Sequence, residues 1–160
     1  MKFIEDTEDG FDLEKYLQYL ESMRGRLPPN TKHFVFHEDH YNFTSEKCLH
    51  DSWVQHLTLE ERPLGTHGSD RVVNINLKLL GAFHDGYHHL TYHNVESYSL
   101  RLRKTARSAT IIGHGDWLID EVTLNENGMV CHEIIFSDTG TWKIVCADIS
   151  YRWSAGQPDQ

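Results

Sequence analysis

After Pro29 the chain consists of short runs in which apolar and polar residues alternate, and this pattern restricts the possible folds more than any other feature. Alternation over four to eight residues is typical of a strand with one buried face. Such runs lie at 33–37, 53–59, 73–79, 90–92, 98–102, 117–124, 130–136 and 142–146. The connections at 85–86, 125–128 and 138–140 suit hairpins and leave no room for a crossover helix. The sequence therefore predicts a mainly β fold, an antiparallel β-sandwich or open barrel of about eight strands.

One α-helix is predicted before these strands. Asp12 is a candidate N-cap, Gly25 stands where a glycine would end a helix, and Pro28-Pro29 is expected to prevent its resumption. Leu13, Tyr16, Leu17, Leu20 and Met23 follow at helical spacing, and we expect this stripe to cover the β core. The 160 residues predict a single domain with an acidic segment 1–11, a helix 12–25, a β domain 30–153 and a tail 154–160.

Charge and cysteine content indicate a class of partner and a compartment. The chain has 15 Lys and Arg against 24 Asp and Glu, a formal net charge of −9. This balance disfavours nucleic acid and anionic membranes, and it suits a basic protein partner. There is no signal-peptide pattern and no apolar run of membrane-spanning length, and the three cysteines show no paired spacing. We expect a cytoplasmic protein with reduced thiols; its oligomeric state is left open.

The 12 histidines are unusually many, and His84, His88 and His89 crowd one segment as metal-ligand candidates. A two-residue turn at Asp85-Gly86 would pair Leu79 with Tyr92 and place His89 and His93 on the polar face with Lys78. Four residues along a strand span about 13 Å, too far for both imidazoles to bind one metal. We expect a solvated or partner-facing histidine surface and no metal or other cofactor; histidines from separate strands remain the alternative ligand set.

A second register argument concerns a candidate catalytic row. If Phe136 pairs with both Trp142 and Trp117, then His132 faces Cys146 on one side and Glu121 on the other. A carboxylate, an imidazole and a thiol in a row can generate a reactive thiolate. A two-residue turn at Asn127-Gly128 would break the row. We expect a packed histidine beside a small buried cysteine, with Cys131 on the opposite face from Cys146 and no disulfide between them.

Between Cys48 and Trp153 several short segments occur in an order that resembles a known group of proteins. They are Leu49-His50-Asp51-Ser52, Leu79-Leu80-Gly81-Ala82-Phe83-His84-Asp85, Gly113-His114-Gly115-Asp116, His132-Glu133-Ile134 and Trp142-Lys143-Ile144. The group comprises small, uncharacterised bacterial β-rich proteins, some of which are classed with the immunity proteins of polymorphic toxin systems. The resemblance implies a non-enzymatic protein-binding role, namely inhibition of a toxin. The alternative is a small enzyme or a ligand- or metal-binding protein that uses Glu121, His132 and Cys146.

Overall fold

The computed structural model describes residues 1–8, 10–65, 70–102, 113–137 and 140–156, and these form a mainly β structure, as predicted. In chain order the elements are β1 (Glu5–Thr7), β2 (Gly10–Asp12), α1 (Glu14–Met23), α2 (Pro29–Val35), β3 (Trp53–Leu64), β4 (Asp70–Leu80), β5 (Gly86–His93), β6 (Ser97–Arg101), β7 (Trp117–Leu124), β8 (Val130–Phe136), β9 (Thr141–Cys146) and β10 (Asp148–Ala155).

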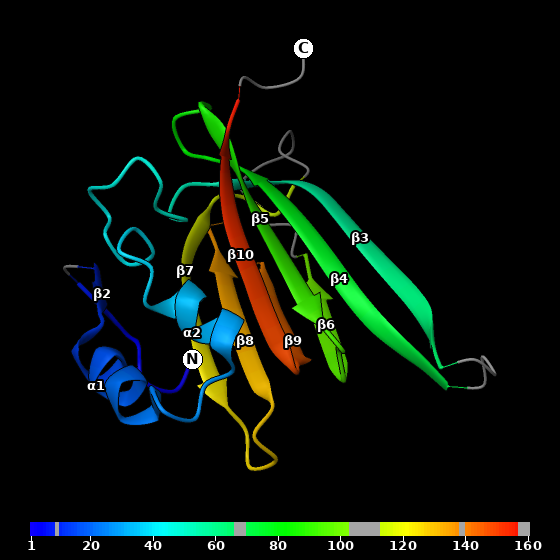
Figure 1. Ribbon diagram of the computed structural model, residues 1–160. Coiled ribbons are helices and arrows are strands. Elements are labelled where there is room, and N and C mark those ends of the chain that lie inside the picture. The colour runs from blue at the N-terminus through cyan, green and yellow to red at the C-terminus, as the bar shows by residue number, and fades with distance from the viewer. Residues whose placement is uncertain (9, 66–69, 103–112, 138–139, 157–160) are drawn as a thin grey trace.

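Two antiparallel four-stranded sheets form a sandwich (Figure 1). The long sheet has the strand order β10-β5-β4-β3, and the short sheet has the order β6-β9-β8-β7. The chain passes from the long sheet to the short one between β5 and β6, and returns between β9 and β10. The predicted antiparallel sandwich is thus confirmed. The small hairpin of β1 and β2 lies apart from both sheets.

The core lies between the two sheets, where the alternating residues of each strand point inwards. From the long sheet it contains Ile75, Leu77, Leu79, Leu90, Tyr92 and Ile149, and from the short sheet Trp117, Val122, Ile134, Phe136, Trp142 and Ile144. All twelve are at most 2% exposed. Because the same period of two recurs along the chain, each strand of the two four-stranded sheets turns one mainly apolar face to this layer.

The two helices cover edge strands on one side of the sandwich. Tyr16 and Tyr19 of α1 bring hydroxyl oxygens that accept hydrogen bonds from the edge of β7, from Val122 N–H (2.7 Å) and Leu124 N–H (2.9 Å). On β10, the Thr31 hydroxyl of α2 accepts a hydrogen bond from Ile149 N–H (2.9 Å). These contacts satisfy backbone groups that an edge strand leaves without a partner. With ten and seven residues, neither helix of the described chain could cross a membrane.

Helix α2 corrects the prediction of a strand at 33–37 and of a single helix. The sequence argument treated Pro28-Pro29 as a barrier to further helix. Pro29 instead occupies the first turn of α2, where the missing N–H has no helical partner in any case. The structure also extends the strand count, since β1 and β2 lie mainly within the predicted acidic segment and β10 includes Ser154 and Ala155 of the predicted tail.

Helix α1 confirms the predicted helix but not the whole of its buried stripe. The N-cap position is occupied by Leu13 and not, as predicted, by Asp12, although Asp12 Oδ1 accepts a hydrogen bond from Glu14 N–H (2.9 Å) just before the helix. Tyr16 and Leu20 are buried, whereas Leu17 is 46% exposed, so its predicted burial is wrong. The helix docks on the edge of a strand and not on a broad sheet face. A narrow stripe with steps of three, four and three residues, from Leu13 to Met23, is sufficient for such a contact.

Candidate functional site

A carboxylate, Asp120 of β7, lies in the interior at 2% exposure and accepts hydrogen bonds from four side chains. His40 Nε2 and His132 Nε2 each lie 3.0 Å from Asp120 Oδ2. The Trp117 indole N–H donates to Oδ1 (3.1 Å), and the Tyr41 hydroxyl donates to Oδ2 (3.3 Å). The buried charge is therefore surrounded by donors, as a buried carboxylate requires.

The hydrogen-bond partners assign the protons in this cluster. His40 Nδ1 donates to the carbonyl oxygen of Phe34 (3.0 Å), and its Nε2 faces the carboxylate, so both nitrogens carry hydrogen and the ring is an imidazolium. His132 Nε2 faces Asp120, and its Nδ1 lies 3.0 Å from the Tyr92 hydroxyl oxygen. Burial alone would raise the pKa of Asp120, but the positive charge of His40 and hydrogen bonds from both histidines hold it well below its usual range.

An imidazole beside a carboxylate can serve as a general base, but only where a substrate can reach it. His40 is 5% exposed and His132 is fully buried, and both ring nitrogens of each are engaged. The cluster joins three parts of the molecule: the segment after α2 through His40, the short sheet through Asp120 and His132, and the long sheet through Tyr92. Its geometry is that of a structural buried ion pair.

The structure does not assemble the predicted row of Glu121, His132 and Cys146. Trp117 does pair with Phe136, but the register shifts between Trp117 and Ile119. Beyond this bulge Glu121 pairs with Glu133, while His132 pairs with Val122 and Ile144, and Cys146 pairs with Val130. A shift of one residue turns a side chain to the other face of a sheet. Asp120 consequently takes the place beside His132 that was predicted for Glu121.

Glu121 and Cys146 have other, separate environments. The buried Glu121 carboxylate accepts backbone N–H bonds from Lys2 (2.7 Å), Phe3 (2.7 Å) and Ile4 (2.9 Å), which fastens the N-terminal segment to the outer face of the short sheet. Cys146 is fully buried, and burial raises the pKa of its thiol to about 12. A protonated, inaccessible thiol is a poor nucleophile. Cys131 pairs with Val145 and lies on the opposite face from Cys146, as predicted, and both are free.

The metal-ligand candidates His84, His88 and His89 occupy three different places. The buried His88 bonds the Tyr151 hydroxyl (3.1 Å) inside the sandwich, and His89 bonds the Ser154 hydroxyl (2.8 Å) on the outer face of the long sheet. His84 lies in the β4–β5 connection against Trp53, with ring centroids 4.7 Å apart. Within the described residues, no group of three or more His, Cys, Asp or Glu side chains is arranged to hold a metal ion.

The turn predicted at Asp85-Gly86 is longer than two residues, and the β4–β5 pairing differs from the prediction accordingly. Leu79 pairs with His88 and Ile75 with Tyr92, so the predicted register is wrong by four residues. An even shift keeps every side chain on its expected face. His89 therefore does lie on the outer face beside Lys78, as predicted.

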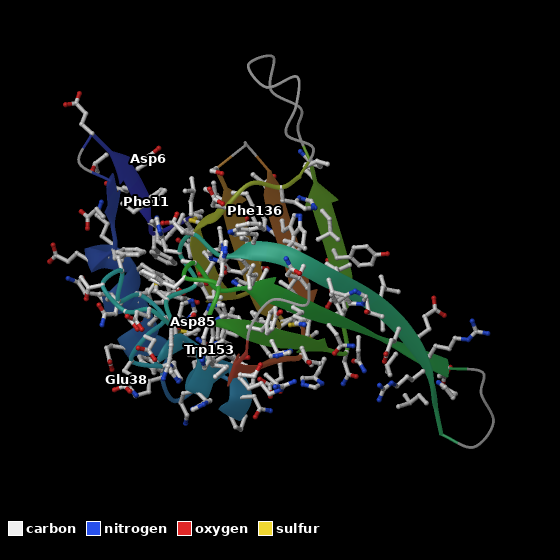
Figure 2. The ribbon with its side chains drawn as sticks, turned by 90° about the horizontal axis from the view of Figure 1, so that it is seen from above. Asp6, Phe11, Glu38, Asp85, Phe136 and Trp153 are labelled. Carbon is white, nitrogen blue, oxygen red and sulfur yellow. The ribbon has the colours of Figure 1, made fainter. Side chains whose placement is uncertain are left out.

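The side of the sandwich opposite the helices is open. Its edge strands are β3 and β6, and among the described elements each has a single strand partner and no covering helix (Figure 1). Trp53 and Leu59 of β3 and Tyr98 of β6 are 40–50% exposed there. The ends of β3 and β4 extend past β5, which pairs with β4 only over residues 75–80. Figure 2 shows this arm projecting away from the N-terminal hairpin that carries Asp6 and Phe11.

No protein-family model, curated protein or solved structure matches this chain. The site must therefore be interpreted from its own geometry.

Sequence reasoning missed Asp120 and His40, the two charged members of the interior cluster. A signal for Asp120 exists in the three successive apolar residues Trp117, Leu118 and Ile119, which interrupt the alternation and are compatible with a bulge. His40 has no comparable signal, because it lies in an irregular segment where no period relates position to burial.

Proposed function

We propose that this chain is a non-enzymatic protein-binding module whose partner docks on the open side formed by β3 and β6. The observation that carries the proposal is the difference between the two sides of the sandwich. Edge strands expose backbone donors and acceptors, and proteins usually cover or interrupt them. Here β7 and β10 are covered by tyrosine and threonine hydroxyls from the helices, while β3 and β6 have no such cover among the described residues.

The composition of the open side supports a partner that adds a strand. In strand addition, main-chain hydrogen bonds provide affinity and alternate side chains provide specificity. β3 is 12 residues long, and its register places Leu57 and Leu59 opposite Leu77 and Ile75, on the face that points into the sandwich. Leu59 is nevertheless 40% exposed. A strand beside β3 would bury this side chain and pair the free backbone edge.

The class of partner follows from the resemblance and from charge. We propose a toxin as the partner and this chain as its inhibitor, on the resemblance to immunity proteins noted from the sequence segments. A net charge of −9 favours encounter with a basic protein. The small-enzyme alternative is not carried forward, because the row of Glu121, His132 and Cys146 on which it rested is not formed.

The test uses the purified full chain as an affinity ligand for proteins of the organism that makes it. The edge variant carries Leu59→Lys and Tyr98→Lys, both at exposed positions. The matched control is Leu17→Lys, which adds a cation at an equally exposed position on α1. We expect one protein to be retained by the wild type and the control, with at least tenfold weaker affinity for the edge variant.

Two results would contradict the proposal: equal retention by the edge variant, or no specific retention by the wild type. The toxin assignment has its own test, which measures growth of cells that express the captured protein with and without this chain. If the captured protein is harmless, the toxin assignment is wrong while the docking surface stands.

A further inference from the structure

The end of helix α2 brings two histidines together at the surface of the molecule. His33 is exposed in the helix, and His37 follows it by four residues. The helical turn continues past the end of α2, because the backbone N–H of His37 donates to the carbonyl oxygen of Phe34 (3.2 Å). Side chains four residues apart on a helix are neighbours, and the two imidazole rings are in contact.

The spacing of these rings suits two ligands of one metal ion. Their centroids are 5.7 Å apart, and their planes are at 84°. Imidazole nitrogens bind zinc at about 2.0–2.1 Å, and two imidazoles at a tetrahedral angle then have centroids about 5.2 Å apart. Because His33 is exposed, a small rotation of its side chain is enough to close the difference. No other two histidine rings of the described chain are in contact.

The ring nitrogens that would bind the ion are free. Among the described residues, no hydrogen bond or ion pair engages either ring nitrogen of His33, or Nε2 of His37. His40, three residues further along, provides a contrast, because it is buried and both of its ring nitrogens are engaged. Of the three histidines in this segment, two are therefore available as ligands.

His37 also has a carboxylate at its other ring nitrogen, an arrangement that is usual for metal-binding histidines. Its Nδ1 lies 3.6 Å from Asp39 Oδ2 and 3.4 Å from the Asp39 backbone nitrogen. The Ser45 hydroxyl donates to Asp39 Oδ1 (2.5 Å), and the Tyr151 ring packs against the imidazole with centroids 5.4 Å apart. When Nε2 binds an ion, the ring proton resides on Nδ1, where this carboxylate accepts it.

The surroundings of the pair favour a cation. The chain has a net charge of −9, and the exposed Glu38, labelled at the edge of the molecule in Figure 2, follows His37 directly. Lys32 precedes His33 in the helix, but adjacent helical residues do not face each other. The mean field of the molecule and the nearest exposed carboxylate therefore both attract a positive ion.

We infer that His33 and His37 form an open site for Zn²⁺ or a divalent transition-metal ion of similar ligand preference. Imidazole is a preferred ligand of such ions, whereas Mg²⁺ prefers oxygen ligands. No third protein ligand joins the pair among the described residues, so water fills the remaining coordination positions. The inference is independent of the protein-binding proposal, because α2 lies on the side of the sandwich away from β3 and β6 (Figure 1).

The experiment is a calorimetric titration of the full, metal-free chain with Zn²⁺ and, separately, with Mg²⁺. The wild type is compared with His33→Asn and His37→Asn, in which asparagine keeps a polar group near the Nδ1 position and removes Nε2. The control is His84→Asn, at an exposed histidine whose left-handed backbone (φ 58°) asparagine adopts readily. We expect the tightest Zn²⁺ site to be weakened at least tenfold in either α2 variant and to be unchanged in the control, with no saturable binding of Mg²⁺.

A second measurement does not depend on the variants being folded. In NMR spectra of the imidazole nitrogens of the wild type, the first equivalent of Zn²⁺ should shift the signals of His33 and His37 before those of other histidines. The inference is overturned if Zn²⁺ does not bind saturably, if Mg²⁺ binds as tightly, if His84→Asn weakens the tightest site as much as the α2 variants do, or if other histidines respond first. Circular dichroism verifies that each variant is folded.

Discussion

Asp120 links two buried histidines, because its carboxylate balances the positive charge of His40 and also accepts a hydrogen bond from His132. Replacing it by Asn removes the negative charge and leaves a buried imidazolium without a counter-ion. Breaking one partner of a buried ion pair typically costs about 3–5 kcal/mol. We therefore expect Asp120→Asn to lower the free energy of unfolding, measured in urea, by about that amount.

The matched control for this prediction is Glu133→Gln, which breaks the ion pair with Lys143 on the surface of the same sheet. Exposed ion pairs contribute about 0–1 kcal/mol, so this variant should unfold almost like the wild type. If Asp120→Asn cost no more than Glu133→Gln, the proton assignment at His40 would be wrong.

The reactivity of Cys146 distinguishes a structural thiol from a catalytic one. Because it is fully buried and its pKa is raised to about 12, almost no thiolate forms near neutral pH. We expect iodoacetamide to modify it only after unfolding, as followed by mass spectrometry of the intact protein. The other cysteines, Cys48 and Cys131, are buried too and serve as internal references. Rapid stoichiometric labelling of Cys146 in the folded protein would contradict this account.

At the scale of elements, substitutions in α1 can show whether a narrow stripe of buried side chains is enough to hold this helix on the edge of a strand. Leu20 is 1% exposed, whereas Leu17 is 46% exposed. Truncation of a buried leucine to alanine costs about 2–5 kcal/mol, and a surface substitution usually stays within about 0.5 kcal/mol. Leu20→Ala should therefore lower the melting temperature clearly, and Leu17→Ala should leave it nearly unchanged. A similar loss in both variants would mean that Leu17 is covered in solution.

The strands show what the sequence could and could not predict. Their existence and buried faces followed from the period of two, and an error of four residues between β4 and β5 left every face correct. The same reasoning failed between β7 and β8, because one bulge changes the parity of all later pairs. Helix α2 was missed because proline at a first helical position resembles proline that breaks a helix.

At the scale of the whole molecule, the polar interior couples the layers. His132 of the short sheet bonds Tyr92 of the long sheet, while His88 of the long sheet lies in the same interior with one ring nitrogen bonded to Tyr151. Burial, followed by the charges of His40 and His89, lowers the pKa of His88 to about 3. Protonation of His88 or of Asp120 therefore changes the stability of the entire sandwich.

The resulting pH dependence can be derived from these two groups. The unfolded chain protonates His88 near its ordinary pKa of 6.5, whereas the folded chain does not do so until about pH 3. Stability is thus fully present above pH 6.5 and falls as the pH drops below it, at about 1.4 kcal/mol per unit, or roughly 3 kcal/mol by pH 4. Asp120, whose pKa is lowered from 3.8, adds a further loss only below that value.

Two variants isolate the histidine contribution in urea unfolding measured at intervals from pH 7.5 to 4. In His88→Asn the group that takes up a proton on unfolding is gone, so the fall in unfolding free energy over this interval should be smaller by roughly 3 kcal/mol, whatever the variant's stability at pH 7.5. Leu17→Asn, which changes an exposed position of α1 without removing a titratable group, should retain the wild-type slope. Parallel slopes for His88→Asn and the wild type would show that His88 becomes protonated within the folded sandwich, which would require that its burial is relieved by solvent in solution.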